Sequence, residues 1–128
     1  MEQAKKAKPE QRITPHFTEG ELACRCCGRL LVQSELVHKL ETLRQLVKKP
    51  VLVNSGYRCP AHNRAVGGAV NSYHLKGMAA DIHVPGLAVV ELSRLAEQAG
   101  FNGIGTYPKQ SFLHVDVRGN RARWQESF

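Results

Sequence analysis

Residues 71–83, NSYHLKGMAADIH, concentrate side chains that can bind a metal ion or move a proton. His74 and Asp81 lie seven residues apart, and Gly77 between them allows the chain to reverse direction easily. A third ligand, His114, is available in the later segment FLHVDV. Two histidines and one carboxylate with an open fourth position are typical of a catalytic zinc site. The alternative is a solvated turn followed by strand residues that only form hydrogen bonds.

The elements that must position these residues indicate an α+β fold. Apolar residues at three- and four-residue steps predict helices over residues 34–49 and 87–99, and the Thr18–Glu21 capping-box spacing and Pro60 predict two shorter helices. VLVNS (51–55), AADIHV (79–84), GIGTY (103–107) and FLHVDV (112–117) read as strands, the last two as a hairpin. We therefore expect a small, mainly antiparallel sheet with helices packed on it.

Composition limits the domain count and the partners. The 128 residues suit one domain, which we expect at 15–128 after a flexible, basic arm at 1–14. The net charge of +7 favours anionic partners, but the basic residues are scattered and form no nucleic-acid-binding motif. Apolar runs are too short for a membrane span, and the N-terminus lacks the apolar segment of a secretory signal. We expect a monomer made in the cytoplasm that acts at the cell wall or periplasm after phage-type or other release.

The motif S-x-H-x-x-G-x-A-x-D matches Ser72 to Asp81 at every fixed position, and SGYRCPAHN (55–63), GIGTYP (103–108) and FLHVDVR (112–118) follow the same family order. The chain thus resembles the zinc D-Ala-D-Ala metallopeptidases, which share their fold with the hedgehog signalling domain. The resemblance implies a catalytic Zn²⁺ held by His74, Asp81 and His114. It also implies that Arg58 grips a substrate carboxylate, which a planar guanidinium does well through paired hydrogen bonds.

Four further residues of these blocks are assigned to substrate binding or to support of the ligand side chains: Ser72, Tyr73, His83 and Tyr107. His83 shares a strand face with Asp81, because side chains on a strand alternate. Either it lines the cleft or it is a hydrogen-bonded structural histidine.

The sequence departs from part of the family at the general base. Many relatives carry Glu three residues before the last histidine or His two residues before it, whereas this chain has Ser111 and Phe112 there. Asp116 lies two residues after His114 and therefore on the same strand face. Asp116 is the candidate for taking the proton of the attacking water; alternatively, it orients a ligand histidine.

The cysteines allow three interpretations. Cys24-x-x-Cys27 and Cys59-x-x-His62 have ligand spacing and could form a second, structural zinc site. A disulfide between the Cys24–Cys27 cluster and Cys59 is the rival, and free thiols are the third option. Nothing indicates a cysteine nucleophile, because no Cys–His pair is implied near the His74 motif.

The leading functional hypothesis is a zinc peptidase that hydrolyses peptidoglycan stem or cross-link peptides by metal-activated water, as a D-Ala-D-Ala carboxypeptidase or an endopeptidase. The alternative is a non-catalytic metal-binding domain that recognises cell-wall peptides or a protein partner, which the missing Glu or His before His114 favours. A basic nucleic-acid-binding domain would leave the His74 cluster unexplained.

Overall fold

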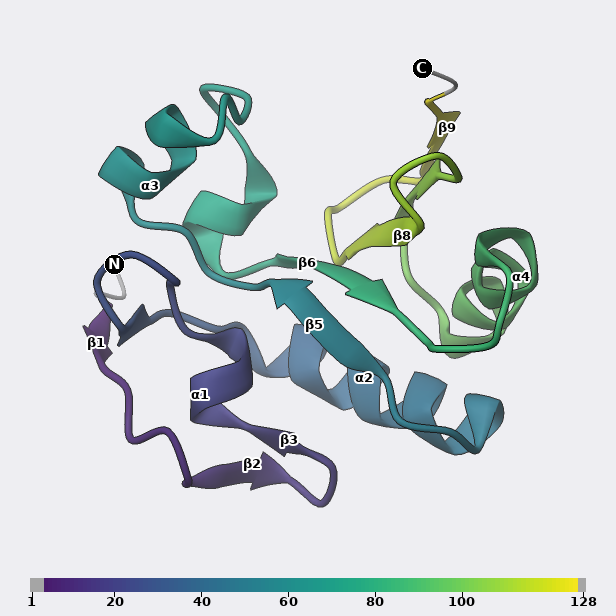
Figure 1. Cartoon of the computed structure of the whole chain (residues 1–128), viewed down its shortest axis with the longest axis horizontal. Helices are drawn as coiled ribbons and strands as arrows, with labels where there is room; N and C mark the ends of the chain where they lie inside the picture. Colours follow the sequence, from purple (N-terminus) through teal and green to yellow (C-terminus); the bar gives the residue numbers. More distant parts are fainter. Residues whose placement is uncertain (1–3, 127–128) are drawn as a thin grey trace.

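The computed structural model describes residues 4–126 and has the α+β architecture expected from the sequence (Figure 1). Its central sheet has five strands, in the spatial order β5 (Leu52–Ser55), β6 (Ala79–His83), β8 (Phe112–Asp116), β7 (Gly103–Tyr107) and β9 (Ala122–Gln125). Every neighbouring pair is antiparallel except β7 and β9, which run parallel. The predicted hairpin of β7 and β8 is confirmed.

Local capping explains where the helices begin and end. The helices are α1 (Glu19–Leu22), α2 (Ser34–Val47), α3 (Pro60–Ala65), the 3₁₀ helix η1 (Tyr73–Lys76) and α4 (Val89–Ala99). Thr18 and Glu21 form the predicted capping box of α1. Lys48 ends α2 in the left-handed conformation, two residues before Pro50, and Gly100 ends α4 in the same way.

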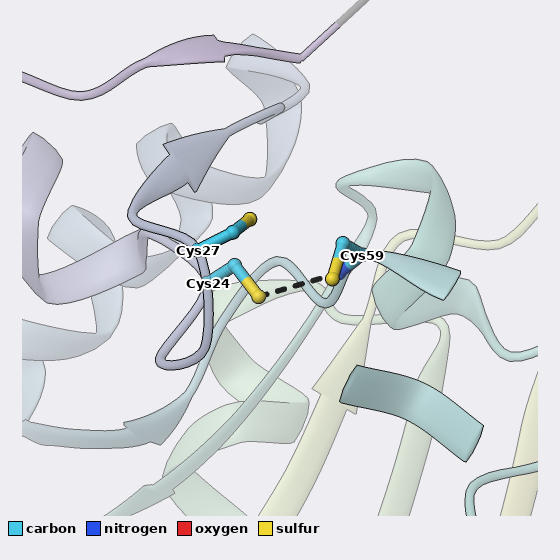
Figure 2. Close-up of side chains that lie close together, drawn as sticks. All are labelled: Cys24, Cys27 and Cys59. Atoms are coloured by element: carbon cyan, nitrogen blue, oxygen red, sulfur yellow. Dashed lines mark hydrogen bonds between the residues drawn. The ribbon is translucent and has the colours of Figure 1, made fainter. Parts of the chain in front are cut away.

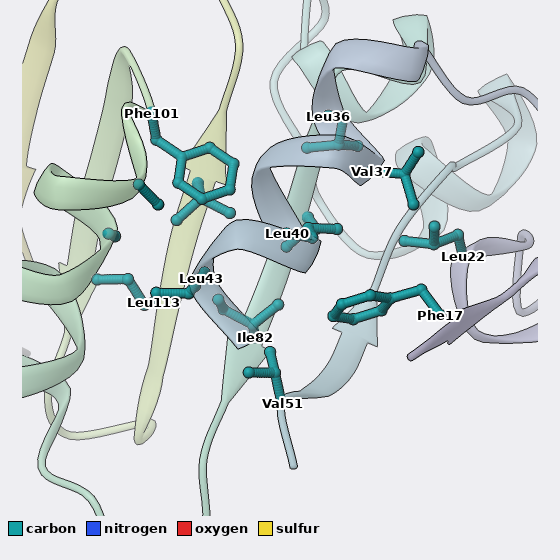
Figure 3. Close-up of a cluster of buried hydrophobic side chains, with 14 of the residues drawn as sticks. Phe17, Leu22, Leu36, Val37, Leu40, Leu43, Val51, Ile82, Phe101 and Leu113 are labelled. Atoms are coloured by element: carbon teal, nitrogen blue, oxygen red, sulfur yellow. The ribbon is translucent and has the colours of Figure 1, made fainter. Parts of the chain in front are cut away.

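The hydrophobic core lies on one face of the sheet, where alternate strand residues pack against α2 and α4. Ala80 and Ile82 of β6 and Leu113 and Val115 of β8 are fully buried on this face. Figure 3 shows α2 between this layer and the N-terminal segment, with its buried side chains directed to both. Because side chains alternate, the residues between them, including Asp81 and His114, point to the opposite face of the sheet.

Residues 4–14 pack against the rest of the chain, which differs from the flexible arm expected at 1–14. β1 (Lys5–Lys6) pairs with β4 (Arg29–Leu30), and β2 (Arg12–Thr14) pairs with β3 (Phe17–Thr18). Ala7 is buried, and Glu19 accepts hydrogen bonds from the Lys8 amide and the Lys5 ammonium. The expected arm is therefore packed from residue 4 onward; residues 1–3 lie outside the described chain. None of the described helices is long and apolar enough to cross a bilayer.

Candidate active site

A single row of cross-strand neighbours builds the site on the face opposite the core helices. Ser55, Asp81, His114, Gly105 and Trp124 are successive register partners across β5, β6, β8, β7 and β9. Directly opposed residues lie close enough for their side chains to meet. The sheet register alone therefore brings together residues from five separate segments of the chain.

His74 joins this row from η1, and the turn after it depends on glycine. Gly77 ends η1 with a φ of 70°, and a Cβ at this position would lie 2.4 Å from the Leu31 carbonyl oxygen. Only glycine suits both the left-handed conformation and the close approach. The turn returns the chain to β6, so that His74 faces Asp81 four residues after Gly77.

The three predicted metal ligands converge on one point. His74 Nε2 lies 3.2 Å and His114 Nδ1 lies 3.1 Å from the same oxygen, Asp81 Oδ1. The three candidate ligand atoms all lie within 4.8 Å of one another. Zinc–ligand bonds of about 2.0–2.1 Å in a tetrahedron place neighbouring ligand atoms about 3.3 Å apart, so the geometry and the ligand types suit zinc.

The remaining ring nitrogens have partners that fix each imidazole. His74 Nδ1 donates to the Gly56 carbonyl oxygen over 2.8 Å, which directs Nε2 toward Asp81. His114 Nε2 lies 2.7 Å from Asp116 Oδ2, which leaves Nδ1 facing the same point. Metal-ligating histidines are ordinarily held in this way, by a carbonyl or carboxylate on the other nitrogen.

Burial and hydrogen bonding oppose each other in the electrostatics of the site. Burial raises the pKa of Asp81, but the contacts with His114 and His74 outweigh it and hold the pKa far below the ordinary value. Burial lowers the pKa of His114, but its contacts with Asp116 and Asp81 leave the net pKa raised. Asp81 is therefore ionised at neutral pH, as a metal ligand must be.

Asp116 lies beneath the site and has no exposed surface. Its oxygens accept from the Arg118 amide, Nε and Nη2 at 3.1, 2.9 and 2.8 Å, in addition to the His114 contact. Burial raises the pKa of Asp116, but His114 and Arg118 outweigh it and the net pKa is strongly lowered. The alternation of side chains along a strand predicted that Asp116 lies on the same face as His114. Nothing in the sequence indicated that Asp116 pairs with Arg118.

Arg58 reaches the metal-ligand cluster from the loop before α3. Its Nη2 lies 3.1 Å from Asp81 Oδ2, the carboxylate oxygen that does not face the two histidines. Its Nε donates to Ser55 Oγ over 3.1 Å, and Nη1 lies 3.3 Å from Asn63 Oδ1. These contacts orient the guanidinium, which forms part of the cleft lining.

A cleft of about 490 Å³ opens over the cluster. Its walls include Trp124, whose ring lies 5.1 Å from the His114 ring and whose Nε1 donates to Tyr107 Oη over 3.0 Å. Gly105 makes this possible, since a Cβ there would lie 2.2 Å from the Trp124 ring. Sequence reasoning missed Trp124 as a site residue, because its place depends on the parallel pairing of β9 with β7.

The structure places three of the four remaining predicted residues in the cleft. Ser72 Oγ accepts from the His74 amide at 3.2 Å and caps η1, Tyr73 lies 4.6 Å beneath the Arg118 guanidinium, and Tyr107 stacks on Phe112. His83 lies outside this cleft, with Nδ1 against Asn54 Oδ1. His83 lies on the same face of β6 as Asp81, as predicted, but it is two residues further along the strand and therefore beyond the cleft.

Three cysteines form a second cluster (Figure 2), and none of them lines the cleft. The sulfur atoms of Cys24, Cys27 and Cys59 lie within 4.8 Å of one another, and no disulfide joins them. Burial raises the pKa of the Cys24 thiol, but the backbone amides of Cys59, Cys27 and Cys26 outweigh it and lower the pKa to about 7. His62, the other residue with ligand spacing, is not part of this cluster.

Comparison with known proteins identifies the same region. A family model described as Peptidase M15 matches residues 15–116, which include all three predicted metal ligands. Peptidoglycan L,D-endopeptidase MepK of Escherichia coli K12 is 38% identical over 82 residues, which cover 60% of this chain and 44% of the relative. Zinc D-Ala-D-Ala carboxypeptidase of Streptomyces albus G is 36% identical over 89 residues, which cover 67% of this chain and 34% of the relative. The chain thus spans less than half the length of these relatives.

Proposed function

We propose that this chain, which belongs to the Peptidase M15 family, is a zinc-dependent peptidase that hydrolyses peptide bonds of peptidoglycan. The observation that carries the proposal is the convergence of His74 Nε2, His114 Nδ1 and Asp81 Oδ1 at the floor of a cleft. The printed names of the relatives, a peptidoglycan endopeptidase and a zinc carboxypeptidase, support the substrate class and the metal.

His74, Asp81 and His114 would hold one zinc ion. When bound, zinc supplies a Lewis acid that lowers the pKa of water and polarises a scissile carbonyl. The protein keeps the ligands ready for this ion: Gly56 and Asp116 hold the two rings, and Arg58 holds the outer oxygen of Asp81. The ligand atoms are therefore positioned by contacts that do not depend on the metal.

Arg58 and Arg118 present two guanidinium groups to the cleft. Both line the cleft, and each is fixed by a carboxylate, Asp81 for Arg58 and Asp116 for Arg118. The stem peptides of peptidoglycan carry free carboxylates, which suit these fixed guanidinium groups. We propose that Arg58 binds such a carboxylate, since it is the guanidinium in direct contact with a metal ligand.

For Asp116 we propose the role of a positioning residue rather than that of general base. It has no exposed surface, and both of its oxygens are engaged by His114 and Arg118. A group that takes a proton from water needs an oxygen within hydrogen-bonding reach of that water. The carboxylate of Asp116 instead accepts from His114 Nε2 and keeps Nδ1 directed at the metal position.

The test is to incubate purified peptidoglycan with the zinc-loaded protein and identify released peptides by mass spectrometry. We expect new peptide ends from the wild type and from His38→Ala, which changes an exposed histidine on α2, but not from His74→Ala or a chelator-treated sample. The chemistry of the new ends distinguishes removal of a terminal D-Ala from cleavage within the stem or bridge. If the zinc-loaded wild type releases nothing, the domain is a binding module and the enzymatic proposal is wrong.

A further inference from the structure

The cysteine cluster joins two segments that are far apart in the sequence. Cys24 and Cys27 lie between α1 and β4, and Cys59 lies directly before α3. A fourth sulfur lies beside this group: Cys26 Sγ is 4.0 Å from Cys59 Sγ, but Cys26 is not among the three cysteines whose sulfurs all lie within 4.8 Å of one another. Figure 2 shows the side chains of Cys24 and Cys59 directed toward each other across the gap between the segments.

The first segment is a tight turn that brings Cys24 and Cys27 together. The Gly28 amide donates to the Cys24 carbonyl oxygen over 2.9 Å, and the Cys24 amide donates to the Arg29 carbonyl oxygen over 2.8 Å. Gly28 has a φ of 72°, a left-handed conformation that favours glycine directly after Cys27. The C-x-x-C-G sequence is therefore folded into a closed turn with both sulfurs in the same cluster.

Backbone amides approach the sulfurs of both segments. The Cys59 amide donates to Cys24 Sγ over 3.4 Å, which ties the two segments directly. Cys59 is the N-cap of α3, and its own sulfur accepts from the His62 amide over 3.4 Å. Amide donors of this kind suit sulfur atoms that carry negative charge, as thiolate ligands do.

We propose that Cys24, Cys27 and Cys59, with Cys26 as the fourth ligand, bind a structural zinc ion distinct from the one in the cleft. Zinc–sulfur bonds of about 2.3 Å in a tetrahedron place the sulfurs about 3.8 Å apart. Three sulfurs are already within 4.8 Å of one another, and Cys26 Sγ is 4.0 Å from Cys59 Sγ. Closing a four-thiolate site requires the exposed Cys26 side chain to turn toward the other sulfurs of the cluster.

The position of the cluster indicates what the ion does. Cys59 directly follows Arg58, and the Tyr57 amide of the same loop donates to the Leu22 carbonyl oxygen of α1 over 2.8 Å. The loop also contains Gly56, whose carbonyl oxygen holds His74 and whose missing Cβ would lie 2.6 Å from the same Leu22 oxygen. A zinc ion here fastens α1 and the N-terminal segment to the loop that orients His74 and Arg58. The proposal does not depend on the bond that the enzyme cleaves.

Cobalt substitution of the His74→Ala variant tests this proposal apart from catalysis. Cobalt bound by several thiolates gives strong thiolate-to-metal charge-transfer absorption, which imidazole and carboxylate ligands do not give. We expect this absorption with about one cobalt per chain, and about two zinc ions per chain for the wild type. Cys59→Ser should lose the absorption and one zinc, whereas Ser93→Ala, a substitution on α4 away from the cluster, should keep both.

Thiol reactivity provides a measurement that does not require a cysteine variant to fold. In reduced, zinc-loaded wild type, the cluster thiols should react slowly with a disulfide reagent. After zinc is removed with a chelator, the rate of this reaction should rise. Absence of the thiolate–cobalt absorption, or equal thiol reactivity with and without chelator, would overturn the proposal. A Cys24–Cys59 or Cys26–Cys59 disulfide in protein purified with zinc, found by peptide mapping, would do the same.

Discussion

Replacement of Asp116 by asparagine separates the two roles that a carboxylate beside His114 can have. Asp116 Oδ2 accepts from His114 Nε2 and Arg118 Nη2, and Oδ1 accepts from the Arg118 amide and Nε. Asparagine keeps the size of the side chain but has a single amide oxygen, so one of these two sets of donors must face its N–H₂ group, and the negative charge that holds His114 Nε2 is lost. The hold on the His114 ring weakens, and with it the direction of Nδ1 toward Asp81.

The expected magnitude follows from the contacts of Asp116 to the ligand. Loss of a carboxylate that supports a metal-ligating histidine costs about 10–100-fold in metal affinity, or about 1.4–2.7 kcal/mol. We therefore expect a 10–100-fold increase in the zinc dissociation constant of Asp116→Asn. Turnover at saturating zinc should stay within about tenfold of the wild type, because the ion restores the position of His114. The 2.7 Å contact and the complete burial of Asp116 are the basis of this expectation.

The assay is a zinc titration by competition with a chromophoric chelator, followed by peptide-release kinetics at saturating zinc. Glu91→Gln is the matched control, because it makes the same chemical change in an exposed ion pair with Arg94 and should alter neither quantity. Thermal unfolding followed by circular dichroism establishes that each variant is folded. The reasoning is refuted if zinc affinity is unchanged while turnover falls by about 10²–10⁴-fold, the effect of losing a general base.

Three further predictions rest on the site and the core. In the metal-free protein, the stability that comes from the raised pKa of His114 is complete below about pH 6.5, and the stability that comes from the lowered pKa of Asp81 is complete above about pH 4. Urea unfolding in the presence of chelator should therefore show the greatest free energy of unfolding between these two pH values. Zinc affinity should fall about tenfold per pH unit over the range in which His114 becomes protonated. Trp124→Phe removes the donor to Tyr107 and should raise KM about three- to tenfold at unchanged zinc content. Leu40→Ala should lower the free energy of unfolding by about 2–5 kcal/mol in denaturant titrations at fixed zinc, because Leu40 is fully buried.

The sequence predicted the parts of the structure that have strong local signals. The helical spacing of apolar residues predicted α2 and α4, and short segments of β-branched and alternating residues predicted β5 to β8. The three proposed zinc ligands were named from the resemblance together with their positions in a loop and two strands. Their convergence follows from a register that alternation already favours.

The parts that the sequence did not reveal depend on tertiary pairing. The strands β1 to β4 contain only two or three residues each, too few for a periodic pattern. The parallel pairing of β9 with β7 has no local signal, so the place of Trp124 over His114 was missed. For Asp116, alternation gave the strand face but not the Arg118 contacts that engage its oxygens.

The core and the site share one constraint, which is the register of β8 against β6. Leu113 and Val115 pack under the helices because His114 and Asp116 point the other way. A slip of one residue would place both leucine and valine over the cleft and bury the two polar side chains among apolar ones. Burying an unpaired carboxylate costs several kcal/mol, so packing strongly disfavours the slipped register. The position of His114 opposite Asp81 is therefore enforced by the same apolar side chains that stabilise the fold, whether or not a metal ion is bound.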